Sequence, residues 1–296
     1  MKRRVGVGTV ALGCAVGAAA AVAIGTGRWN RAVAAAVGRL SNHEAVADAS
    51  AAPPPEAPPD GQACASLPDP VRRYVEFAIP AGSPRIRRAR VRWRGELRVP
   101  GTEAWIPFRA AQHFTVQPPG FVWNARVRMA TVLPVRVLDR YVGGRAGSRA
   151  RLAALWPLGG QRGGSGGTPQ AAASSLTRHL AERVWLPTAL LPSEGVAWSL
   201  VDERTARATL TDRGTTASVD FQFGPNGEIV GCSADRHREI DGQLVLTPWR
   251  GRFEDYVPAA GLMIPMAAQA EWLLPQGPLP VWRAELVDIG YAFGPG

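Results

Sequence analysis

Apolar and polar side chains alternate along residues 87–99, which read RRARVRWRGELRV. Ala89, Val91 and Trp93 fall on one side of this two-residue repeat. The other side holds five arginines: Arg88, Arg90, Arg92, Arg94 and Arg98. Because successive side chains of a strand point to opposite faces, the pattern predicts a strand with one packed face and one basic face.

The same repeat recurs along most of the chain that follows. It predicts strands at 87–99, 104–116, 121–130, 134–142, 196–202, 205–211, 215–223, 228–238, 243–248, 251–257, 263–273 and 281–293. Asn226-Gly227 and Asp241-Gly242 favour tight hairpin turns between strands. Arg126 and Arg128 again occupy a polar side, so we expect the basic row to continue across neighbouring strands.

Two segments show helical spacing instead. Residues 67–80 carry apolar side chains at helical intervals between two prolines and predict a short helix. Residues 171–187 predict a second helix, which Pro187 ends. Residues 159–170, GGQRGGSGGTPQ, lack the GK[ST] of a phosphate-binding loop and predict a flexible connection.

The order of these elements predicts an α+β, mostly-β fold. About eleven or twelve antiparallel strands, with one helix before them and one central helix, favour a single large sheet. A sheet of that size must curl because its strands twist, so we expect a curved, half-open barrel that wraps its two helices. This plan resembles the fold of bacterial lipoprotein carriers.

The N-terminal residues indicate a segment that directs the protein to a membrane. Lys2, Arg3 and Arg4 precede residues 5–25, a run without charge that is just long enough to cross a bilayer. It predicts a signal anchor or a signal peptide within residues 1–27, followed by a juxtamembrane helix and proline-rich linker at 28–65 and one β-rich domain at 66–296. The basic cluster before the apolar run favours a cell-membrane protein whose C-terminal domain is extracytoplasmic.

Charge is spread unevenly along the chain. The net charge is +10, from 34 basic and 24 acidic residues, but residues 71–160 alone hold 17 arginines and four acids. Such an excess indicates an anionic partner. Nucleic acid is not expected outside the cytoplasm, so we expect the basic face to meet membrane lipid or an envelope polymer. The predicted binding residues on that face are Arg88, Arg90, Arg92, Arg94, Arg126 and Arg128.

Candidate catalytic chemistry is sparse. The four histidines lie far from one another and from the three cysteines in sequence, so no metal site and no cofactor is expected. No nucleophile motif is readable, although Cys64 and Cys232 could form one disulfide. Glu182 lies one turn before Trp185 in an apolar helix end; there it is either a carboxyl that desolvation turns into a general acid or an ion-pair partner of Arg178. Glu194 is the second candidate acid.

Several longer stretches resemble a known family. They read PPGFVWNARVRM, DRYVGGR, LAERVWLPTALLPSEGVAW, TPWRGRFEDY and EWLLPQGPLPVWR. Together they are similar to an uncharacterised bacterial domain family of unknown function, over roughly residues 66–292. The resemblance implies one domain, often behind an N-terminal membrane segment, and brings no catalytic residues with it.

The sequence thus favours a membrane-tethered extracytoplasmic domain that binds a lipid-like or acidic amphiphilic ligand in the concavity of its sheet. Trp185, with Trp93, Trp123 and Trp198, is expected to form the apolar wall of that concavity. Two alternatives remain: an envelope hydrolase that uses Glu182 or Glu194 as its acid, and an envelope sensor that binds a protein partner. Clustering of those carboxylates with Tyr141, His113 or Arg145 would favour the enzyme.

Overall fold

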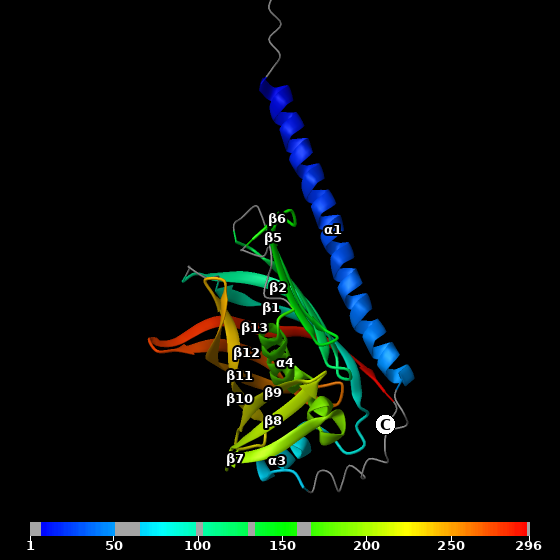
Figure 1. Ribbon diagram of the computed structural model, residues 1–296, viewed down its shortest axis with the longest axis vertical. Helices are drawn as coiled ribbons and strands as arrows, with labels where there is room; N and C mark the ends of the chain where they lie inside the picture. The colour runs from blue at the N-terminus through cyan, green and yellow to red at the C-terminus, as the bar shows by residue number, and fades with distance from the viewer. Residues whose placement is uncertain (1–6, 51–65, 99–102, 130–133, 159–166, 295–296) are drawn as a thin grey trace, which may run out of the picture.

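The computed structural model describes residues 7–50, 66–98, 103–129, 134–158 and 167–294, and within the first helix it describes side chains for residues 20–45 (Figure 1). Its main feature is one 13-stranded sheet. The strands are β1 (Ile86–Arg98), β2 (Trp105–Thr115), β3 (Gly120–Val127), β4 (Val135–Val142), β5 (Arg145–Leu152), β6 (Trp156–Pro157), β7 (Val196–Asp202), β8 (Thr205–Asp212), β9 (Thr215–Phe223), β10 (Ile229–Ile240), β11 (Gln243–Ala259), β12 (Leu262–Leu274) and β13 (Gly277–Phe293).

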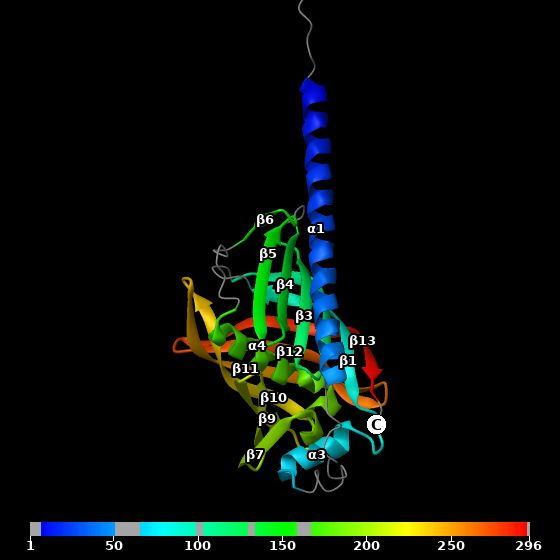
Figure 2. The same ribbon diagram turned by 45° about the vertical axis from the view of Figure 1, so that its right-hand side comes forward.

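The first and last strands pair with each other and so join the two halves of the sheet. Strands β1 to β6 follow one another outward on one side of this pair, and β13 to β7 follow one another outward on the other side. Every neighbouring pair is antiparallel. The sheet curves without closing, since β6 and β7 remain its two edges (Figure 2). The predicted fold class, mostly β with one large curved antiparallel sheet, is confirmed.

The α-helices of the described residues are α1 (Val7–Ser50), α3 (Asp69–Ala78) and α4 (Pro169–Glu182). Thr168 caps α4 by accepting a hydrogen bond from the backbone N–H of Ala171 at 3.2 Å. The sequence places the end of this helix at residue 187, but it ends at Glu182. Three 3₁₀ turns follow: η1 (Arg183–Trp185), η2 (Pro187–Leu190) and η3 (Pro192–Glu194). Pro187 has no N–H and disfavours a helical residue before it, so the α-helix cannot continue.

Three strand predictions need correction. The strands β5 and β6 were not expected, because RAGSRARL has little β propensity; β5 forms by pairing with β4 along its whole length. The segments 243–248 and 251–257 are one continuous strand, β11. Pro248 lies inside β11, opposite Asp235 of β10. It is tolerated because the pairing of β11 with β12 begins only at Trp249, so the missing N–H of Pro248 leaves no bond to β12 unmade.

The sheet separates two packing surfaces. The inner face of the sheet and α4 form the main core, and α4 contacts strands from both halves of the sheet. On the outer face, α1 packs over β2, β3 and β4 through a smaller cluster that includes Trp29, Leu40, Val122 and Leu138. The N-terminal half of α1 runs on past the sheet (Figures 1 and 2).

The membrane predictions concern residues that are described only in part. Among the described residues, no helix combines the length and hydropathy needed to cross a membrane. The described helix α1 includes 28–49, which the sequence predicts as helical. Residues 1–6, the proline-rich stretch 52–61, Cys64 and most of the glycine-rich segment 159–170 lie outside the described residues.

Candidate functional site

A cavity of about 410 Å³ lies between α4, η1 and the inner face of the sheet. Its walls come from strands of both halves of the sheet, because the β1–β13 pairing and the curvature bring them around α4. The apolar lining consists of Leu97, Trp123, Val137, Ala181, Trp185, Trp249, Gly251, Phe253, Ala268, Ala270, Trp272, Val281 and Trp282. Such a predominantly aromatic and aliphatic wall is typical of a small-molecule site.

Packing behind the wall holds its tryptophans in place. Trp185 donates from Nε1 to the carbonyl of Pro265 at 2.9 Å, and its ring meets Trp93 edge-on with ring centroids 4.7 Å apart. Trp123 and Trp185 line the cavity as expected, whereas Trp93 stands behind them. Trp198 was expected in the same wall but is elsewhere, since its Nε1 donates to the carbonyl of Leu190 at 2.9 Å.

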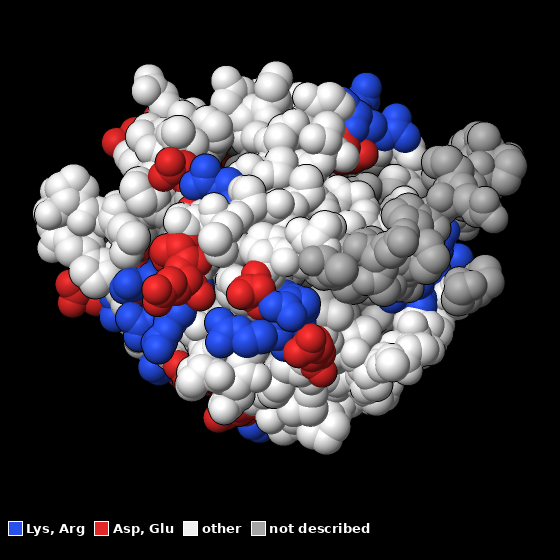
Figure 3. Space-filling model, turned by 90° about the horizontal axis from the view of Figure 1, so that it is seen from below, with Lys and Arg blue, Asp and Glu red and all other residues white. Residues whose placement is uncertain are grey.

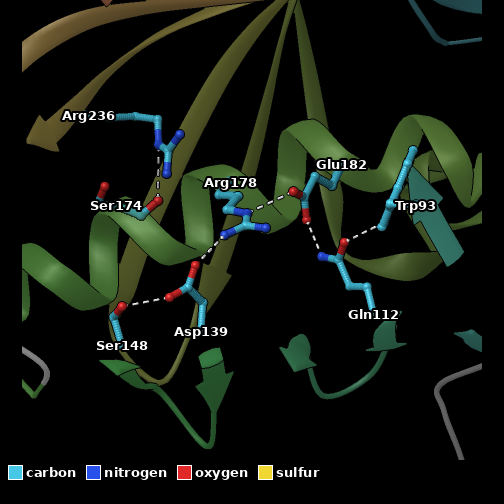
Figure 4. Close-up of polar contacts among 8 residues, drawn as sticks. All are labelled: Trp93, Gln112, Asp139, Ser148, Ser174, Arg178, Glu182 and Arg236. Atoms are coloured by element: carbon cyan, nitrogen blue, oxygen red, sulfur yellow. Dashed lines mark hydrogen bonds and ion pairs between the residues drawn. The ribbon is translucent and has the colours of Figure 1, made fainter. Parts of the chain in front are cut away.

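A chain of polar side chains crosses one side of the cavity (Figure 4). Arg178 donates to Glu182 at 2.7 Å and to Asp139 at 3.2 Å, and Gln112 donates to the other oxygen of Glu182 at 2.7 Å. Ser148 donates to the second oxygen of Asp139 at 2.6 Å. Burial alone would lower the pKa of Arg178, but Glu182 and Asp139 outweigh it and raise the pKa. Arg178 is thus matched by two carboxylates.

Arg236, also in the cavity wall, is bonded to no carboxylate of the described residues. Its guanidinium carbon lies 4.9 Å from the ring centroid of Trp249 and 5.8 Å from that of Trp272. Its Nε donates to the backbone carbonyl of Ser174 at 3.3 Å, and no carboxylate among the described residues forms an ion pair with it. Burial, aided by the charge of Arg178, lowers the pKa of Arg236 to about 10, so the group is cationic at neutral pH.

The two candidate acids do not meet. Glu182 lines the cavity, but both of its oxygens accept hydrogen bonds, and the pairing with Arg178 that the sequence allowed is present. Glu194 is buried elsewhere and accepts a hydrogen bond from Gln117 at 3.0 Å.

The residues that would have completed an enzyme site are also dispersed. Tyr141 donates to Asp212 at 2.7 Å, and His113 and Arg145 lie outside the cavity. The cluster required by the enzyme alternative is therefore not formed in the described part of the chain. Those residues also contain no group of three or more metal-ligating side chains.

The predicted arginine row lies on the outer face, opposite the cavity. Arg92 pairs with Asp288 at 3.0 Å, Arg94 pairs with Glu285 at 2.5 Å, and Arg88 pairs with Glu44 of α1. The pairs of Arg92 and Arg94 are exposed on both sides, so each is worth little stability, whereas Glu44 in the third pair is buried. The other three predicted binding arginines, Arg90, Arg126 and Arg128, are exposed. Arg98 was also expected on the basic face of this strand, but it lines the cavity.

Sequence reasoning missed Arg236, Asp139 and Gln112. A signal for Arg236 exists: it follows the buried Cys232 at period two within β10, so it had to face inward. Asp139 and Gln112 alternate in the same way with outward residues of β4 and β2. Their partner on α4 comes from a distant part of the chain, and no local pattern identifies it.

Solved structures of several proteins are similar to this chain. A LolA superfamily protein from Nitrosomonas europaea is 14% identical, covering 76% of this chain and 93% of that one, with a TM-score of 0.33. A DUF1329 family protein from Desulfovibrio piger is 9% identical, covering 81% and 96%, with a TM-score of 0.38. A beta-barrel-like DUF1849 protein from Brucella abortus is 12% identical, covering 71% and 100%, with a TM-score of 0.27.

No curated protein matches the sequence. In agreement with the resemblance seen in its motifs, the chain belongs to a family of unknown function, DUF6544, whose model matches residues 58–284.

Proposed function

We propose that this protein binds one anionic amphiphile, such as a fatty acid or a lipid with an acidic headgroup, in the cavity between the sheet and α4. The observation that carries the proposal is an apolar cavity of about 410 Å³ whose wall contains Arg236, a cation without an ion-pair partner among the described residues. Pockets of roughly 300–1,000 Å³ with apolar walls and a few polar groups are the usual sites of small ligands.

The charges of the cavity favour an acidic ligand. Its lining includes three arginines and two carboxylates, Arg98, Arg178, Arg236, Asp139 and Glu182, which leaves one positive charge in excess. Because the two carboxylates are both bonded to Arg178, neither Arg98 nor Arg236 has an ion-pair partner among the described residues. An acidic head beside Arg236 would pair with a guanidinium that two indole rings already hold in position.

The rest of the lining suits the apolar part of the ligand. Trp185, Phe253 and Trp282 continue the wall away from Arg236, and Arg98 lines the cavity near Trp282, whose strand partner is Leu97. Burying a methylene there gains about 0.8 kcal/mol. An alkyl chain along these rings would therefore supply most of the affinity, while Arg236 would favour a headgroup with negative charge.

A direct test is equilibrium dialysis of the full-length chain with radiolabelled dodecanoate below its micellar concentration. We expect saturable one-to-one binding, and Arg236→Gln should weaken it at least tenfold, which corresponds to about 1.4 kcal/mol. Arg252→Gln is the matched control, because Arg252 is exposed on the opposite face of the neighbouring strand.

The proposal also predicts selectivity for charge. Dodecyltrimethylammonium has a chain of the same length and a cationic head, so it should bind more weakly than dodecanoate to the wild type. Equal binding of the two amphiphiles, or equal loss in Arg236→Gln and Arg252→Gln, would contradict the assigned role of Arg236. Native mass spectrometry of protein from the bacterial envelope, before and after organic extraction, would identify the natural ligand.

We further propose that residues 5–25 tether the domain to the cell membrane, with residues 66–296 outside the cytoplasm. The support is the uncharged run in the sequence, the basic cluster before it, and the position of α1, whose N-terminal half runs past the sheet (Figure 1). A membrane location would give the cavity access to its ligand.

A further inference from the structure

The helix α1 leaves the domain at one particular end of the sheet. Trp29 fixes the helix to the outer face by donating from Nε1 to Asn124 of β3 at 3.0 Å. One turn closer to the N-terminus, Gly25 packs directly against Leu155 in the turn after β5. The helix then continues beyond the strands (Figure 2). This exit end is bounded by the last residues of β3 and β5 and the first residues of β4.

A row of arginines crosses the outer face at the exit end. Arg109 of β2 lies opposite Arg126 of β3. Arg126 in turn lies opposite Arg136 of β4, and Arg136 lies opposite Arg151 of β5. Adjacent strands are about 4.8 Å apart, so these like charges stand side by side, an arrangement that destabilises a sheet. Burial, together with the charge of Arg126, lowers the pKa of Arg136.

Nothing within these strands offsets the row. Asp139 is the one acidic residue of β2, β3, β4 and β5, and its side chain points inward to Arg178. None of the ion pairs among the described residues includes an arginine of the row. The opposite end of the molecule is different, because acidic and basic side chains are interspersed there (Figure 3).

Exposed apolar side chains accompany the arginines. Trp156 is 58% exposed and pairs with Leu152, the neighbour of Arg151. Met129 follows β3 and is 43% exposed, and Ile24 of α1 is 56% exposed. Tryptophan is enriched where a protein meets the boundary between lipid and water, and arginine pairs with lipid phosphate. The exit end combines both chemistries.

We propose that the exit end rests on a membrane surface that contains anionic lipids, with Arg126, Arg136 and Arg151 contacting headgroup phosphates and Trp156 at the interface. This inference rests on the proposed tether and adds the orientation of the domain and the class of lipid. Anionic headgroups would supply the counter-charge that the strands lack. The domain would then stand on the membrane with α3 and β7 at its far end (Figure 1).

Flotation of the full-length chain with vesicles tests the inference. One set of vesicles is phosphatidylcholine alone, and the other also contains phosphatidylglycerol. We expect at least tenfold stronger partition of the wild type onto the anionic vesicles, and a preference that falls as salt rises. A basic residue at an anionic surface contributes about fivefold to binding. The triple variant Arg126→Gln, Arg136→Gln and Arg151→Gln should therefore lose most of the preference while still floating with phosphatidylcholine.

The matched control replaces three exposed arginines elsewhere, Arg73, Arg204 and Arg252, with glutamine and should keep the preference. Equal partition of the wild type onto both vesicles, a preference independent of salt, or an unchanged preference in the exit-end triple variant would overturn the inference. If the wild type does not float with phosphatidylcholine vesicles but still floats with the anionic vesicles, the tether is overturned and the arginine surface is supported. The salt series needs no variant, so a preference that does not change with salt would overturn the inference even if the triple variant misfolds.

Discussion

His179 and Arg183 are ionisable residues that the core encloses completely. The two terminal nitrogens of Arg183 donate to backbone carbonyls, to Ala189 at 2.5 Å and to Val116 at 3.1 Å, and so tie the 3₁₀ turns to the sheet, whereas its Nε has no partner among the described residues. His179 is different, because neither ring nitrogen has a partner among the described residues. Burial, aided by the charge of Arg183, lowers the pKa of His179 well below its ordinary value of 6.5. The histidine is therefore neutral in the folded protein.

This pKa predicts how stability depends on pH. Below pH 6.5 the unfolded chain binds a proton at His179 and the folded chain does not, so the free energy of unfolding must fall as the pH falls. The loss from this residue should reach about 1.4 kcal/mol at pH 5.5. Urea unfolding between pH 7.5 and 5.5 measures it, and His179→Leu should lose less stability over that range than the wild type. Identical pH slopes in the two proteins would refute a neutral buried histidine.

At the scale of elements, α1 is attached to the domain by few contacts. Trp29 is 4% exposed and anchors the small outer cluster. Removing a buried tryptophan side chain typically costs about 3–5 kcal/mol. We expect Trp29→Ala to release α1 locally, so hydrogen exchange at residues 28–45 should speed up by about a hundredfold while β3 and β4 stay protected. Arg31→Ala, on the exposed side of the same helix, is the control; equal loosening of α1 and the sheet in Trp29→Ala would contradict local attachment.

Elements were predictable where local pattern and packing agree. The alternation in residues 87–99 identified β1 because its inward side chains are the ones that the core buries. The strand β5 has no such signal and exists because β4 offers an edge to pair with. The end of α4 was misplaced because helical spacing of apolar side chains persists into η1, where the fold buries them in a tighter turn. Tertiary contacts decided both cases.

At the scale of the whole molecule, the sheet divides the charges between two faces. On the inner face, two carboxylates pair with Arg178, whereas none of the described residues forms an ion pair with Arg236. On the outer face, a row of arginines crosses the end of the sheet at which α1 leaves the domain. The sequence predicted Trp185 in the wall of a concave apolar site, and it indicated the neighbouring Glu182 as a candidate acid or an ion-pair partner of Arg178. Alternation within β10 places Arg236 on the inner face, but its position in one cavity with Asp139 and Trp123 depends on β13 pairing with β1, which no local pattern shows.

The tryptophans of the cavity can report the binding of an anionic amphiphile. Five of the 10 tryptophans line the cavity: Trp123, Trp185, Trp249, Trp272 and Trp282. We would titrate the full-length protein with a brominated fatty acid, whose bromine quenches nearby indole fluorescence. We expect saturable one-to-one quenching, with half-saturation at a ligand concentration at least tenfold higher in Arg236→Gln than in the wild type. Quenching that never saturates, or that is identical in the two proteins, would contradict it.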